Sequence, residues 1–113
     1  MNTLVILNDA PYGSERSYNA LRLARALSKE PDQVVRVFLM GDAVAAAKSG
    51  QKVPEGYYNA GDMVRMVGGE VGLCGTCMDA RGLSAVQIVD GVRRSTLKEL
   101  AQWAVEADKV LVF

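Results

Sequence analysis

Short and almost uninterrupted apolar runs alternate along this chain with segments whose apolar residues recur at helical spacing. Four of the runs span Thr3–Leu7, Val34–Met40, Glu70–Cys74 and Lys109–Phe113. Runs of this kind are typical of strands that are buried on both faces of a parallel sheet. The alternation therefore predicts an α/β protein in which helices cover both faces of a parallel sheet through right-handed crossovers.

The first half of the chain contains two predicted helices. One follows a turn-rich loop, is capped by Ser14 or Ser17, and ends at Pro31, because proline breaks a helix. The other spans Ala43–Ser49, and we expect Asp42 to cap it.

In the second half, Gln51–Gly56 is predicted to be a polar loop and a candidate lid, and Tyr57–Val67 a helix. Thr96 and Glu99 have the spacing of a capping box, which predicts that the last helix begins there. The pattern of Gly82–Val92 fits a helical turn and a short strand equally well, so it leaves both open.

The chain of 113 residues is long enough for one domain, residues 1–113, with one hydrophobic core. Thirteen basic side chains balance thirteen acidic ones, so no broad positive field attracts nucleic acid or an anionic membrane. No apolar stretch is long enough to span a membrane or to form the core of a signal peptide, and we expect a reducing, cytoplasmic setting.

Both cysteines lie in one motif, Cys74-Gly-Thr-Cys77, at the end of the third apolar run. In a reducing compartment, cysteines at this spacing are more often reactive or metal-binding than part of a structural disulfide. A thiol that faces the amides of a following helical turn is expected to ionise readily, and Arg81 would add a positive charge. Cys74 and Cys77 are therefore the candidate catalytic residues.

Several functions stay open for these thiols. They could carry sulfur as a persulfide, form a dithiol/disulfide pair, or supply half of a metal site across a subunit interface, since one chain without histidine has too few zinc ligands. They could also be small buried hydrophobic residues without any chemistry. No metal or cofactor is predicted for a single chain, which has neither a dinucleotide-binding fingerprint nor a P-loop.

Ligands of parallel sheets bind at the carboxyl ends of the strands. The residues expected at that edge, together with a turn-rich loop whose amides suit an anion, form the candidate substrate-binding set. The set comprises Asn8, Tyr12, Gly13, Ser14, Asp42, Gly75 and Arg81.

Four sequence blocks resemble the DsrE/DsrF-like family, and most closely its YchN-type branch. The blocks are Asn-Asp-Ala-Pro-Tyr-Gly-Ser-Glu, Val-Phe-Leu-Met-Gly-Asp-Ala-Val, Leu-Cys-Gly-Thr-Cys-Met-Asp-Ala-Arg-Gly, and Glu-Leu-Ala-Gln-Trp with Ala-Asp-Lys-Val-Leu-Val-Phe. They follow one another between Thr3 and Phe113. The resemblance implies a three-layer α/β sandwich around a five-stranded parallel sheet, assembled as a homo-oligomer of three or six subunits.

The resemblance also implies a role for one thiol. Members that take part in sulfur relay, such as the DsrE and TusD subunits, accept sulfur as a persulfide on one cysteine. That cysteine lies as far before an Arg-Gly pair as Cys74 lies before Arg81. By this resemblance Cys74 is the sulfur carrier, with a donor and an acceptor protein as partners. Cys77 has no counterpart in those subunits, and it could release the sulfur by forming a disulfide with Cys74.

The leading hypothesis is therefore a sulfur-relay protein that passes sulfane sulfur from Cys74 to an acceptor protein. One alternative is a non-enzymatic oligomeric module that binds a small ligand and whose cysteines are structural. The other is a thiol/disulfide redox protein that uses the CxxC motif.

Overall fold

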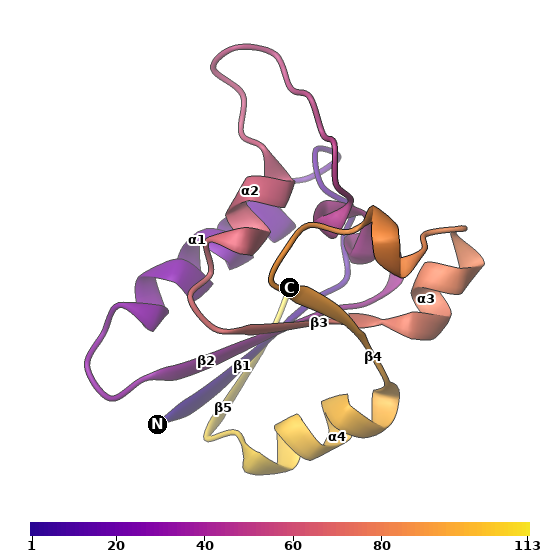
Figure 1. Cartoon of the computed structure of the whole chain (residues 1–113). Coiled ribbons are helices and arrows are strands. Elements are labelled where there is room, and N and C mark those ends of the chain that lie inside the picture. Colours follow the sequence, from indigo (N-terminus) through magenta and orange to yellow (C-terminus); the bar gives the residue numbers. More distant parts are fainter.

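The computed structural model describes residues 1–113 and contains a five-stranded parallel sheet between helices (Figure 1). The strands run in the order β4-β3-β2-β1-β5. They are β1 (Asn2–Leu7), β2 (Val34–Leu39), β3 (Glu70–Cys74), β4 (Val92–Ser95) and β5 (Lys109–Val112). The predicted α/β class and the five-stranded sheet are confirmed.

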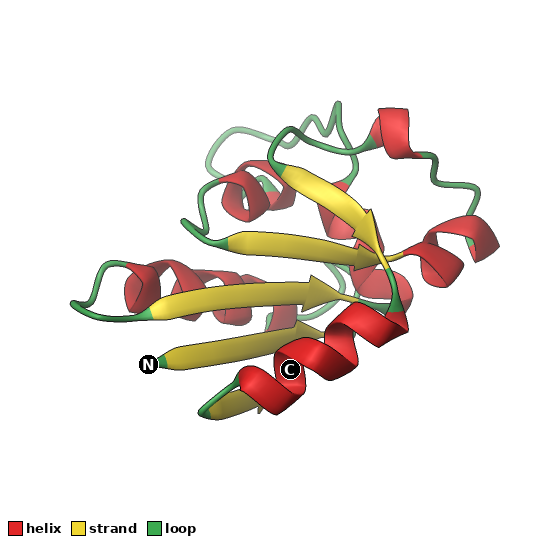
Figure 2. Ribbon diagram, turned by 60° about the horizontal axis from the view of Figure 1, so that its bottom comes forward, coloured by secondary structure: helices red, strands yellow, loops and turns green.

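The helices divide unequally between the two faces of the sheet. The α-helices are α1 (Arg16–Ser28), α2 (Ala60–Arg65), α3 (Gly75–Ala80) and α4 (Leu97–Glu106), and the 3-10 helices are η1 (Gly41–Ala47) and η2 (Ala85–Gln87). In Figures 1 and 2, α4 covers one face alone and the other helices lie on the opposite side. None of the helices combines the length and the hydropathy that a membrane crossing requires.

The sheet separates two hydrophobic cores, because successive strand residues point to opposite faces. The larger core contains 19 buried residues and lies on the side of α1, α2, α3 and η1. The smaller core consists of Leu4, Phe38, Leu100 and Trp103 and lies under α4. Cys74 packs against both cores, which places this residue at the boundary between the two layers.

Trp103 packs α4 against the sheet. Its ring lies over Gly72, where a Cβ atom would come within 3.4 Å of the indole and 3.3 Å of the Phe38 ring. The Phe38 and Trp103 rings meet edge to face, with centroids 6.2 Å apart. The guanidinium carbons of Arg36 and Arg93 lie 5.2 and 5.5 Å from the indole centroid. The position of α4 therefore depends on the missing side chain at residue 72.

The start of α1 differs from the prediction, because neither candidate serine is the N-cap residue. Glu15 is the N-terminal flanking residue and makes no capping bond with its side chain. The hydroxyl of Ser17 instead donates to the carbonyl of Asp9 at 2.6 Å, and that of Ser14 donates to the Asp9 carboxylate at 2.9 Å. Both serines therefore stabilise the preceding loop, and Ser14 also accepts from the Arg16 amide, the first of α1, at 3.4 Å.

Two further helix boundaries are corrected by the structure. The helix predicted at Ala43–Ser49 is the 3-10 helix η1, and Asp42 makes no capping bond in it. The helix predicted at Tyr57–Val67 is shorter, because the side chain of Asn59 accepts a hydrogen bond from the Asp62 amide and starts α2 there. The two tyrosines before Asn59 therefore lie in a loop.

The ambiguous segment Gly82–Val92 contains η2, and β4 begins only at its last residue. As an edge strand that pairs with β3 alone, β4 carries polar residues and lacks the apolar pattern of a buried strand. Thr96 caps α4 as predicted, by accepting a hydrogen bond from the Glu99 amide at 3.2 Å. The Glu99 carboxylate binds Ser95 and Arg93 and does not close the predicted box.

Gly72→Val is expected to lower the free energy of unfolding by about 2 kcal/mol, within the usual cost of overpacking. Trp103, the only tryptophan, should move outward, and its fluorescence emission should shift to longer wavelength. Urea denaturation followed by that emission measures both effects. Gly13→Val is the control, since a Cβ atom at Gly13 meets nothing within 4 Å. Equal stabilities of the two variants would contradict the packing described here.

Candidate functional site

Cys74 joins β3 to α3. It is the last residue of the strand, and its sulfur accepts a hydrogen bond from the Cys77 amide at 3.3 Å. The sulfur thus occupies the place that a serine or aspartate oxygen takes in an ordinary helix cap. The buried side chain of Met78 holds α3 against the larger core. The thiol therefore lies at the carboxyl end of the sheet, as the sequence predicts.

A cavity of about 400 Å³ opens beside this sulfur. It lies where β2, β3 and β4 end and where α3 and α4 begin. The residues that line it include Met40, Cys74, Gly75, Cys77, Arg94 and Leu97. Both cysteines are half-buried and free, so a small sulfur-bearing group in the cavity would contact the thiols.

The expectation of an easily ionised Cys74 is wrong for the single subunit. Burial raises the pKa of the Cys74 thiol above its ordinary value of 9.0, and the neighbouring Cys77 thiol raises it further. The amide of Cys77, which donates to the sulfur, and that of Thr76 lower the pKa, but by less. Loss of hydration therefore disfavours the thiolate more than the amides of α3 favour it.

The cation in this cavity is Arg94, which sequence analysis missed. Its guanidinium donates to both carboxylate oxygens of Asp79, at 2.7 and 2.9 Å. It also lies against Gly75, where a Cβ atom would be 2.8 Å from the guanidinium carbon. Asp79 and, less strongly, the Cys74 thiolate raise the pKa of Arg94. A prediction of β4 from the sequence would have revealed this residue. The parallel register pairs Ser95 with Cys74, so it places the neighbouring Arg94 close to the thiol.

Arg81, which was predicted to assist the thiols, does not line their cavity. Its guanidinium donates to the Asp42 carboxylate at 2.8 and 3.0 Å and to the Cys77 carbonyl at 3.0 Å. Arg81 and Asp42 therefore tie the end of α3 to η1. Arg81 lines a separate cavity of about 190 Å³ on that side.

The remaining candidate residues lie at the same edge of the sheet, but in cavities that do not contain the thiols. One cavity of about 290 Å³ is lined by Asn8, Gly13, Ser14 and Asp42, among others. The side-chain amide of Asn8 donates to the carbonyl of Phe113 at 3.1 Å, which joins the loop after β1 to the end of β5. Tyr12 lines a neighbouring cavity together with three other tyrosines. Of the predicted binding residues, only Gly75 shares the cavity of the two cysteines.

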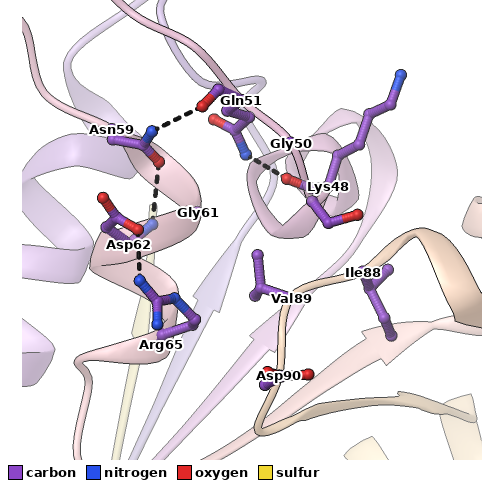
Figure 3. Close-up of a pocket in the computed structure, with 11 residues that line it drawn as sticks. Lys48, Gly50, Gln51, Asn59, Gly61, Asp62, Arg65, Ile88, Val89 and Asp90 are labelled. Carbon is purple, nitrogen blue, oxygen red and sulfur yellow. Dashed lines mark hydrogen bonds and ion pairs between the residues drawn. The ribbon is translucent and has the colours of Figure 1, made fainter.

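A polar cavity of about 300 Å³ lies between residues 48–51, α2 and the segment before β4 (Figure 3). Its polar groups largely pair with one another. Asn59 donates to the carbonyl of Gln51 at 3.1 Å, and Arg65 donates to Asp62 at 2.6 Å. None of the candidate residues lines it. Nowhere in the structure do three side chains of Cys, Asp or Glu gather in a way that could hold a metal ion.

The fold and the cysteine motif together define a class of protein: a parallel α/β domain whose candidate reactive thiol ends an inner strand and caps the following helix. The model of the DsrE/DsrF-like family matches residues 1–113. The chain belongs to this family.

Known proteins agree with this assignment. Protein YchN of Escherichia coli (strain K12) is 48% identical over 114 residues, which cover 97% of each chain. The crystal structure of the E. coli ychN protein matches with a TM-score of 0.90 and 50% identity over 100% of both chains. Uncharacterized protein MJ0989 of Methanocaldococcus jannaschii is 35% identical over 115 residues, 100% of each chain. The predicted family and its YchN-type branch are thus confirmed.

A more distant structure shows how far the fold extends. The protein of unknown function MTH1491 from Methanobacterium thermoautotrophicum matches with a TM-score of 0.73 over 99% of this chain and 97% of its own. Its identity is 14%, so it shows a shared fold alone.

Alkylation of Cys74 by iodoacetamide is expected to reach half its maximal rate above pH 9.0, because burial raises the pKa of this thiol. Arg94→Met should slow the reaction at fixed pH by about two- to fivefold, the effect of one exposed charge. Tandem mass spectrometry of the labelled peptide separates Cys74 from Cys77. Arg81→Met is the matched control and should leave the rate unchanged. A midpoint well below the ordinary thiol value, or equal effects of the two variants, would contradict the geometry.

Proposed function

We propose that the protein is a sulfur-relay protein, which holds sulfane sulfur as a persulfide on Cys74 and passes it to an acceptor protein. The observation that carries this proposal is the position of the Cys74 sulfur. It is half-buried at the end of β3 and open to a cavity of about 400 Å³ that Arg94 also lines. Membership of a family that includes sulfur carriers supports the same function.

Two exchange reactions complete the relay. In the loading step, the Cys74 thiolate attacks the outer sulfur of a persulfide on the donor, a new S–S bond forms on Cys74, and the donor leaves as a thiolate. In the unloading step, a thiolate of the acceptor attacks the outer sulfur on Cys74, and the Cys74 thiolate leaves. Each step replaces one S–S bond by another, so neither an oxidant nor a reductant is consumed.

The surroundings of Cys74 favour the loaded form over the free thiolate. Burial keeps the resting thiol protonated, so the carrier is unreactive before it meets a donor. A persulfide is more acidic than a thiol and carries a negative charge near neutral pH. The amides of Thr76 and Cys77 and the guanidinium of Arg94 lie on the same cavity and would stabilise that charge.

Cys77 provides a second route out of the loaded state. Its thiolate can attack the inner sulfur of the Cys74 persulfide, which forms a Cys74–Cys77 disulfide and expels hydrosulfide. The disulfide would then need a cellular thiol to reduce it. Both thiols line one cavity, and the Cys77 amide donates to the Cys74 sulfur at 3.3 Å, so the two residues are close enough to support this route.

We further propose a cytoplasmic homo-oligomer of three or six subunits. Leu97, Val110 and Val112 are 67%, 44% and 64% exposed. The register places the two valines beside Leu4 and Ile6, on the face that α4 covers only in part. An apolar edge strand of this kind favours pairing with another subunit. Free thiols fit the reducing cytoplasm.

After incubation with a cysteine desulfurase and cysteine, intact-mass spectrometry should show a gain of one sulfur atom. Cys74→Ser should show no gain, whereas Cys77→Ser should keep the sulfur longer than the wild type, because it cannot expel hydrosulfide. Failure of every donor to load Cys74 would overturn the proposal. A Cys74–Cys77 disulfide with a measurable potential and no persulfide would identify a redox protein, and two inert thiols would identify a ligand-binding module.

Native mass spectrometry should find three or six subunits in the assembly. Val112→Lys should shift the population to smaller species, since a charge on a buried apolar interface is costly. Val86→Lys is the control, because Val86 is 90% exposed and lies in η2, away from β5. A monomeric wild-type protein, or equal effects of the two lysines, would contradict the assembly.

A further inference from the structure

All four tyrosines of the chain gather at one place. Tyr12 comes from the loop after β1, Tyr18 from α1, and Tyr57 and Tyr58 from the loop before α2. The Tyr58 ring contacts the other three, with centroid distances of 5.0 Å to Tyr12, 4.5 Å to Tyr18 and 5.3 Å to Tyr57. The rings therefore form one continuous aromatic surface.

The loop that carries Tyr12 is held in an unfavourable conformation to complete this surface. Tyr12 has φ 72°, in the left-handed region that bulky residues avoid. Its amide donates to the Tyr58 hydroxyl at 2.8 Å, and its own hydroxyl binds Gln51 and accepts from the Ala60 amide at 3.0 Å. Strain that is held by specific hydrogen bonds is typical of binding sites.

The surface is open, and the lining of its cavity carries one negative charge. A cavity of about 350 Å³ lies over the four rings, and the Tyr57 side chain is 51% exposed. Glu15 is the one charged side chain that lines the cavity. The faces of aromatic rings also carry negative potential. The pocket therefore attracts a cation more strongly than it attracts an anionic or a neutral ligand.

We propose that this tyrosine pocket binds an alkylated ammonium group. Such a cation spreads its charge over methyl groups and is weakly hydrated, so ring faces can replace its water. A primary ammonium group would lose hydrogen bonds that the ring faces do not return. The chain already places a cation on one of these rings, since the Arg22 guanidinium carbon lies 5.3 Å from the Tyr18 centroid, and the exposed ring of Tyr57 is left for a ligand. No residue of the pocket lines the cysteine cavity, so this site is independent of sulfur relay.

The test compares choline with 3,3-dimethylbutan-1-ol, which has the same shape without the charge. Titration of the full-length protein is followed by NMR of the tyrosine ring protons. Choline should shift these signals in a saturable way, and the neutral alcohol should bind about tenfold more weakly or not at all. No saturable shift with choline, or equal binding of the alcohol, would overturn the proposal.

Three variants locate the site. Tyr57→Leu should weaken choline binding about tenfold, whereas Tyr57→Phe should retain it, because the ring face and not the hydroxyl makes the contact. Glu15→Gln should weaken binding and reduce its dependence on salt. An unchanged Trp103 emission shows that each variant is folded. Equal affinities of Tyr57→Leu and Tyr57→Phe would overturn the proposal.

A short peptide with one trimethyllysine shows which kind of molecule supplies the alkylated ammonium group. Tighter binding of the peptide than of choline indicates a protein side chain, and weaker binding indicates a free small molecule.

Discussion

The contact of Trp103 with Gly72 is the constraint on which the rest of the structure depends, because α4 has its face of the sheet to itself. Two arginines of the sheet, Arg36 and Arg93, flank the indole, and both bind Glu70. These ion pairs are exposed and contribute little each, but they shield the indole from water. The packing of one aromatic ring on a strand without a side chain therefore sets the distance between α4 and the sheet.

The same contact shapes the cysteine cavity. Gly72 and Cys74 point to the same face of β3, since residues two apart share a face. Trp103 occupies the space over Gly72, and Leu97 at the other end of α4 lines the cavity over Cys74. The sulfur is thus neither sealed in a core nor exposed on a loop. The thiol is half-buried between the two hydrophobic cores because of the position of α4 on the sheet.

The sequence was sufficient to predict the inner strands and the position of Cys74, because a strand buried on both faces leaves an unmistakable apolar run. It was sufficient for β5 as well, an edge strand that keeps an apolar run, but not for β4, whose residues Val-Arg-Arg-Ser show no apolar pattern. Arg94 was missed for this reason. Nearness to Cys77 along the chain predicts that Arg81 assists the thiols, but at the end of α3 its guanidinium binds Asp42.

The ionisation of Cys74 shows another limit of sequence reasoning. The helical turn after Cys74 could be predicted, and its amides do lower the pKa of the thiol. The larger effect is desolvation, which comes from residues far away in the chain that pack around the sulfur. Local sequence reveals the groups that favour a charge, whereas the tertiary structure determines how much water the charge loses.

The titratable groups around Cys74 also constrain how the Cys74 thiol of such a sulfur carrier loses its proton. The chain has no histidine to serve as a base for the thiol. The carboxylate on α3, Asp79, is bound to Arg94 at both oxygens, which holds the pKa of Asp79 below its usual range and makes it a poor proton acceptor. Under the proposed function, no side chain of α3 accepts the Cys74 proton, so the proton passes to solvent or to a group of a docked partner. A partner that covers the cavity between α3 and α4 would supply such a group and would bring its own cysteine to the Cys74 sulfur.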